Sequence, residues 1–160
     1  MSPLHSEPSP KNLYQIDHAQ LLQESFQRVT GTPLLEKQYS PEDAAKALFE
    51  APFALLSHDT QPDPIFTYGN RTAQRLFEIT WDELLQLPSR FSAELPNRDE
   101  RARLLKMVTA QGYINHYEGV RISKTGRRFL IKGAVVWNLI DHQGVNRGQA
   151  ASFDTWSHLD

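Results

Sequence analysis

The chain has 160 residues, of which 39% are hydrophobic and 22% are charged, which is the balance of a single folded domain. Its formal net charge is −2, so we expect no nucleic-acid partner and no attraction to an anionic membrane. It contains no cysteine, which excludes disulfides, thiolate nucleophiles and cysteine-ligated zinc or iron–sulfur centres. The lack of an apolar run of roughly 18–20 residues, and of a signal-peptide pattern at the start, predicts a cytoplasmic protein that does not enter a membrane.

The first 51 residues are predicted to form a lead-in and a helical extension. Residues 1–12 are rich in serine and proline and are predicted to be disordered. Within the extension, residues 13–51, an apolar stripe that includes Leu21, Leu22 and Phe26 predicts a helix over residues 16–29, and Ser40 caps a second one. Because such a stripe must be buried, we expect it to pack against the rest of the domain or a second copy of the chain, and we expect a homodimer.

The middle of the chain alternates short strands with short helices. Apolar runs predict strands over residues 53–57 and 65–68, with His58 and Asp59 in the turn between them. Asn70 caps the next helix, and Thr80 with Glu83 forms a capping box that begins another. A second box at residues 97–100 predicts the start of a longer helix, which ends at Gly112.

The last third changes from a helical period to a period of two residues. Alternating apolar positions predict strands over residues 115–123, 127–140 and 145–153, joined by turns at Gly126 and Gly144. The whole order predicts an α+β fold with a five-stranded antiparallel sheet, helices on one face and the N-terminal helical extension.

Several local motifs resemble the PAS domain. They are the stretch IFTYGNRTA at residues 65–73, TWDEL at residues 80–84, the hairpin at Gly126 and the D-x-x-G turn at residues 141–144. The chain resembles the PAS-related MEKHLA family more closely, in the segments LPSR (87–90), DERARLL (99–105), GVRIS (119–123), GRRF (126–129), VWNL (136–139) and GQAASF (148–153). The resemblance implies a PAS-like domain over residues 52–157 with a sensory or regulatory role, and it supplies no catalytic residues and no ligand.

The sequence leaves the cofactor unknown. Light-sensing PAS relatives use a flavin and a reactive cysteine, so the absence of cysteine excludes that covalent photochemistry and leaves noncovalent flavin binding open. Haem requires an axial ligand, and His116 is the one histidine predicted on the inner face of a sheet strand. A histidine there is more often a hydrogen-bonded pocket residue than a metal ligand.

The predicted binding site is a cavity between the long strands and the short helices. If Val120 points inward, His116 and Glu118 share its face and need partners or a cavity, unless a bulge near Gly119 leaves them exposed. The predicted ligand-binding residues are His116, Glu118, Phe66, Phe77, Val120, Ile131, Val135 and Phe153, with Leu76 and Ile114 as further candidates.

These features predict a stand-alone sensory module that binds a small, mostly apolar ligand or signals by self-association, and not an enzyme. Two alternatives stay open: an interaction domain without a pocket, and a small enzyme in which His116 and Glu118 act as an acid–base pair. Basic residues of the final strands and the long helix are predicted to be a solvated surface, with a basic face for an anionic partner as the alternative; they are Arg98, Arg101, Arg103, Lys106, Arg121, Lys124, Arg127, Arg128, Lys132 and Arg147.

Overall fold

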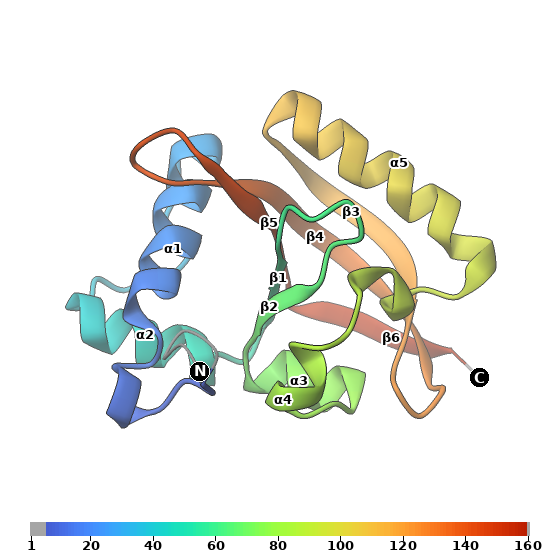
Figure 1. The fold of residues 1–160 in the computed structure, drawn as a ribbon, viewed down its shortest axis with the longest axis horizontal. Coiled ribbons are helices and arrows are strands. Elements are labelled where there is room, and N and C mark those ends of the chain that lie inside the picture. Colours follow the sequence, from blue (N-terminus) through green and yellow to red (C-terminus); the bar gives the residue numbers. More distant parts are fainter. Residues whose placement is uncertain (1–5, 160) are drawn as a thin grey trace.

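The computed structural model describes residues 6–159 and shows a twisted antiparallel sheet with helices on both faces (Figure 1). The strands lie in the order β2-β1-β5-β4-β3, and a sixth strand, β6, pairs with β4. The strands are β1 (Ala54–His58), β2 (Phe66–Gly69), β3 (Tyr113–Ile122), β4 (Arg128–Ile140), β5 (Asn146–Phe153) and β6 (Thr155–Leu159). The helices are α1 (Ile16–Thr30), α2 (Pro41–Glu50), α3 (Arg71–Phe77), α4 (Trp81–Leu84) and α5 (Leu95–Gln111), with short 3₁₀ turns at Pro10–Asn12 and Ser89–Ser92.

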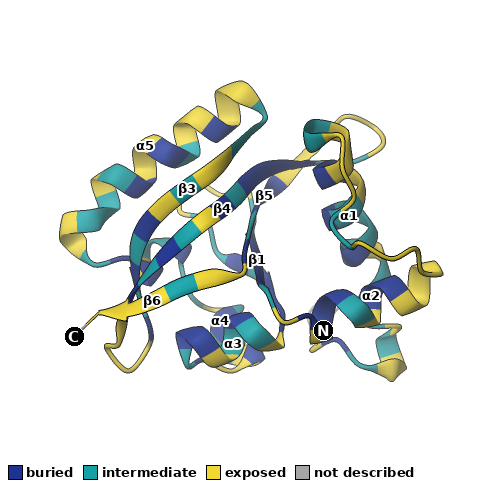
Figure 2. Cartoon of the chain, turned by 180° about the vertical axis from the view of Figure 1, so that it is seen from behind, coloured by how far each residue is buried: buried dark blue, intermediate teal, exposed yellow. Residues whose placement is uncertain are grey.

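The predicted α+β fold with an antiparallel sheet is confirmed. The first five strands occur where the sequence predicts them, with ends that differ by no more than two residues. The unpredicted β6 follows Asp154 and pairs with the first half of β4, from Lys132 opposite Thr155 to Arg128 opposite Leu159. Figure 2 shows that most of β6 and a part of β3 are exposed, because α1 and α2 cover a different part of the sheet.

The helical extension packs against the sheet, on the face opposite α5. Leu22 is fully buried and Phe26 is nearly so, and the ring of Phe26 meets Trp137 of β4 edge-on with a centroid distance of 4.9 Å. Leu21 is half-buried at the edge of the same cluster. The expectation that the stripe is buried is therefore confirmed, and its partner is the chain's own sheet. The stripe thus gives no reason to expect dimerisation through α1.

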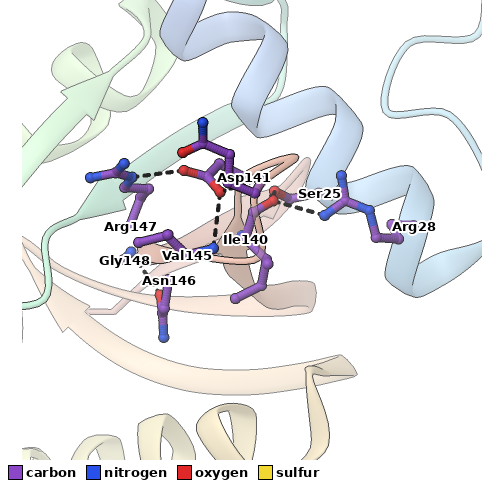
Figure 3. A network of polar contacts seen from close by, with 9 residues as sticks. Ser25, Arg28, Ile140, Asp141, Val145, Asn146, Arg147 and Gly148 are labelled. Carbon is purple, nitrogen blue, oxygen red and sulfur yellow. Dashed lines mark hydrogen bonds and ion pairs between the residues drawn. The ribbon is translucent and has the colours of Figure 1, made fainter.

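A polar network fixes α1 to the end of β4 (Figure 3). Ser25 donates to the carbonyl of Ile140 at 2.9 Å and accepts from its amide at 3.1 Å, and Arg28 donates to the same carbonyl at 2.8 Å. Asp141 then closes the β4–β5 turn by accepting from the amide of Val145. The helix is therefore held by directional bonds as well as by apolar contact.

Asn70 ties three elements together from a fully buried position. Its side-chain oxygen caps α3 by accepting from the amide of Ala73 at 3.0 Å, and it also accepts from Leu55 of β1 at 3.1 Å. Its amide group donates to the carbonyls of Leu48 and Phe53. The predicted caps at Ser40 and Thr80 are likewise confirmed.

The long helix α5 covers the other face of the sheet and is held there by two amide side chains. Asn138 of β4 donates to the carbonyl of Val108 at 3.0 Å, and Gln149 of β5 donates to the carbonyl of Leu105 at 3.1 Å. The helix begins at Leu95, so the predicted start at residues 97–100 is wrong, and its N-cap residue, Glu94, makes no side-chain cap bond.

The start of the chain lies partly outside the described residues. Residues 1–5 of the predicted disordered lead-in are not described, whereas Ser9 caps the 3₁₀ turn Pro10–Asn12. The division of the chain at residues 12 and 51 stays a prediction. Within residues 6–159, no helix has both the length and the apolar character that crossing a bilayer requires.

Candidate functional site

A cavity of about 70 Å³ lies between the sheet and the helices α3 and α5. Its apolar wall comes from β1, β2, α3 and the long strands, and its polar wall comes from the end of β1, α5, β3 and β5. The lining residues are Leu56, Ser57, His58, Phe66, Phe77, Ser92, Arg101, Leu104, Leu105, Tyr117, Arg121, Ile131, Val136, Gln149, Ala150, Ala151 and Phe153.

The structure places only part of the predicted site around this cavity. Phe66, Phe77, Ile131 and Phe153 line it as predicted, although their role in binding stays a prediction. The other predicted residues do not line it: His116 and Glu118 are exposed, Val120, Val135 and Ile114 are half-buried, and Leu76 is buried in the core nearby.

Two bulges explain why the predicted inner face of β3 is wrong. Ile114 pairs with Val136 and Tyr117 with Ala134, so β3 holds one extra residue there, and His116 adopts a left-handed φ of 55°. The next pair is Gly119 with Ile131, so the extra residue is now in β4. The strand therefore turns Tyr117 and Arg121 toward the cavity and leaves His116 and Glu118 exposed, as the alternative of a bulge near Gly119 predicted. The acid–base pair of the enzyme alternative loses its enclosed site.

Tyr117 and Arg121 form the β3 side of the cavity. Nη2 of Arg121 donates to the Tyr117 hydroxyl at 3.1 Å, and that hydroxyl donates to Oε2 of Glu100 on α5 at 2.9 Å. Burial raises the pKa of Tyr117, so it stays a neutral donor. Gly119 makes this arrangement possible, because a Cβ atom there would lie 2.2 Å from the Tyr117 hydroxyl oxygen.

Arg101 reaches the cavity from α5. It is 9% exposed, and its Nη2 donates to the buried hydroxyl of Ser89 at 2.7 Å. Burial, with the repulsion of Arg121 as a smaller cause, lowers the pKa of Arg101 to about 10. The side chain thus stays charged at neutral pH in a site that disfavours charge.

His58 completes the polar wall from the end of β1. Its Nδ1 lies 2.9 Å from the carbonyl oxygen of Asp59, which can only accept, so Nδ1 carries the proton. Burial lowers the pKa of His58, which keeps the ring neutral and leaves Nε2 as an acceptor. That Nε2 atom is buried and has no hydrogen-bond partner within residues 6–159. The backbone of Gly148 packs against this residue so closely that a Cβ atom would lie 1.9 Å from the His58 carbonyl oxygen.

Three polar residues of the cavity were predicted elsewhere: His58 in a turn, and Arg101 and Arg121 on the surface. Arg101 and Arg121 were predicted to be solvated, but both are buried, so that prediction is wrong for these two. Arg101 lies three and seven residues before the buried Leu104 and Val108, so the helical period does place it on the inner stripe. Arg121 carried no such signal, because the regular period of its strand places it outward and only the bulges turn it inward.

A second, wider depression of about 760 Å³ lies on the α1 side, near His18, Tyr68 and Trp81. Its rim includes exposed polar side chains such as Asp17 and Arg147, so solvent satisfies most of its charges. Nowhere in residues 6–159 do three His, Cys, Asp or Glu side chains converge as a metal site requires. The hydroxyl of Tyr68, which lines this depression, is also buried without a hydrogen-bond partner among residues 6–159. The smaller cavity differs in that its wall contains two buried arginine side chains beside the unpaired Nε2 of His58.

Comparison with solved structures defines the class of this fold as PAS-like. A PAS domain from Colwellia psychrerythraea superposes with a TM-score of 0.59 at 17% identity, over 74% of this chain and 95% of that one. A structure titled "Flavin Analogue Sheds Light on Light-Oxygen-Voltage Domain Mechanism" superposes with a TM-score of 0.58 at 17% identity, over 74% of this chain and 85% of that one. At such identities the likeness shows the fold alone.

The family model of the MEKHLA domain matches residues 16–158, and the chain belongs to this family. The homeobox-leucine zipper protein ATHB-14 of Arabidopsis thaliana is 26% identical over 163 aligned residues, which cover 99% of this chain and 19% of that protein. The chain thus spans about a fifth of this relative.

A flavin does not fit the cavity as it stands. Sites for molecules of that size have volumes of roughly 300–1,000 Å³, whereas this cavity has about 70 Å³ and its wall contains two arginine side chains.

Proposed function

We propose that the chain is a sensory module that binds a small molecule in the cavity between the sheet and α5, and that it does so without catalysis. The observation that carries this proposal is the cavity's lining, in which buried polar groups face a mostly apolar space. The PAS-like fold and the MEKHLA family support a sensory role. The apolar part of the site is assigned to Phe66, Phe77, Ile131 and Phe153.

The position of the cavity suggests how a ligand changes the domain. Arg101 belongs to α5 and Arg121 to the edge strand β3, so a ligand that contacts both links the helix to the sheet. The opposite end of α5 is already held by Asn138 and Gln149. Binding would therefore order the first half of α5, which a partner can read. Self-association and a cytoplasmic location stay predictions.

The proposal is tested by filling the cavity. Ala151 lines it, and Ala151→Leu places three more carbon atoms there, whereas Ala102→Leu adds them on the exposed face of α5. Ligand-observed NMR with a panel of small fragments should detect binding to the wild type and to Ala102→Leu, and its loss in Ala151→Leu. If no fragment binds the wild type, or if Ala151→Leu retains binding, the cavity is not a ligand site and an interaction domain becomes the better account.

A further inference from the structure

Two buried arginine side chains lie in the cavity wall, and neither has a carboxylate partner in the described part of the chain. Arg101 and Arg121 are 9% and 7% exposed, and the pKa of Arg101 responds to the positive charge of Arg121. The five ion pairs found within residues 6–159 all use other cations. Glu100 reaches Arg121 only through the Tyr117 hydroxyl. A buried guanidinium is stabilised mainly by a paired anion, so this site is electrostatically incomplete.

The same cavity contains an unused hydrogen-bond acceptor. His58 lines the cavity, and its Nε2 atom is buried without a partner among the described residues. A buried acceptor left unpaired costs free energy that a donor would restore. Because Nδ1 donates to the Asp59 carbonyl, the group that completes the site at Nε2 must bring its own O–H or N–H. The cavity therefore lacks one anion and one donor.

We infer that the cavity binds a small hydroxycarboxylate, with its carboxylate on Arg101 and Arg121 and its hydroxyl donating to Nε2 of His58. This inference rests on the proposed function and names the ligand class of the same site. A planar carboxylate matches the fork of N–H groups that arginine presents. The volume of about 70 Å³ restricts the ligand to a few non-hydrogen atoms. The apolar wall, which includes Phe66 and Phe153, fits the carbon end of such a molecule better than a sulfate or phosphate, whose oxygens point in all directions.

Three probes of matched shape separate the contributions of charge and hydroxyl. Glycolate carries both groups, acetate lacks the hydroxyl, and glycolamide lacks the charge. In an amide-detected NMR titration of the full chain at constant ionic strength, glycolate should shift the resonances around Arg101, Tyr117 and His58. Glycolate should bind roughly ten- to a hundredfold more tightly than glycolamide, which cannot form the charge-assisted bonds to arginine. It should bind roughly two- to tenfold more tightly than acetate, which lacks the hydroxyl.

Two variants test whether Arg101 binds the carboxylate of glycolate. Arg101→Met should lose the preference for glycolate over glycolamide, and Arg103→Met, which changes an exposed arginine of the same helix, should keep it. The wild-type probe series stands without the variants, so a poorly folded Arg101→Met does not leave the inference untested.

Each contrary result has a definite meaning. Equal binding of glycolate and glycolamide in the cavity overturns the anion site and leaves the proposed function standing. Equal binding of acetate overturns the hydroxyl contact to His58, and equal binding of sulfate overturns the carboxylate class. If no probe shifts the cavity resonances while neutral fragments still bind there, this inference alone fails. If neither probes nor fragments bind, the proposed function fails with it.

Discussion

Replacing Arg101 with methionine should leave the fold as stable as before or make it more stable, which is unusual for a buried side chain. Burial and Arg121 lower the pKa of Arg101 from its ordinary value to about 10, which corresponds to roughly 3 kcal/mol against the charged form. The variant also loses the hydrogen bond that Arg101 donates to Ser89, and a hydrogen bond that involves a charged group contributes about 1.5–3 kcal/mol to stability. Methionine retains the length of the side chain and adds apolar burial. The free energy of unfolding should therefore stay unchanged or rise by up to about 2 kcal/mol.

Urea denaturation followed by tryptophan fluorescence measures this change, since Trp137 is buried in the sheet. Arg103→Met is the matched control and should change the free energy of unfolding by less than about 0.5 kcal/mol. A decrease of more than about 1 kcal/mol in Arg101→Met would show that Arg101 is a structural residue satisfied by Ser89. The charge of Arg101 would then be stabilised without a ligand, and the inferred anion site would be refuted.

Three further predictions concern the fold that positions the site. Asn70→Ala should lower the free energy of unfolding, measured in urea, by about 3–5 kcal/mol, because it leaves buried backbone groups unpaired. The control Asn115→Ala, on the exposed edge of the sheet, should change this free energy little, and equal effects of the two variants would contradict the role of Asn70. Leu22→Ala should cost about 2–5 kcal/mol and the exposed Leu95→Ala almost nothing, and a small effect at Leu22 would mean that α1 is not packed on the sheet. Burial lowers the pKa of His18 to about 4, so as the pH falls the unfolded chain binds a proton at His18 before the folded chain does. The free energy of unfolding therefore decreases as the pH is lowered from about 6.5 to about 4. His18→Gln should remove up to about 3 kcal/mol of this decrease in stability. If the pH profile of urea denaturation is the same in the variant and the wild type, the role of His18 is contradicted.

The fold could be predicted from the sequence because its signals are local. Ser40, Asn70 and Thr80 cap helices through their own neighbours, so a few residues suffice to place each helix start. The strands follow from a period of two residues, which fixes where they run but fixes their faces only while the register is regular. The helix α5 began earlier than predicted because Glu94 makes no side-chain cap bond that marks it.

The site could be predicted only in its apolar part. Phe66, Phe77, Ile131 and Phe153 line the cavity, and all four are apolar residues buried in the core between the sheet and α3. The polar part depends on two bulges between β3 and β4, which turn Arg121 inward and His116 outward. Gly119 suggested a bulge as one alternative, but the pairing between strands decides whether a bulge forms and which side chains it turns inward.

The most direct test of the ligand site is to locate a bound probe inside the domain. Nuclear Overhauser contacts between the methylene protons of glycolate and protein methyl groups give this location. We expect contacts to Leu104, Ile131 and Val136, which line the cavity. Contacts confined to exposed methyl groups such as those of Leu95 and Val145, or none at glycolate concentrations that saturate the amide shifts, would contradict it.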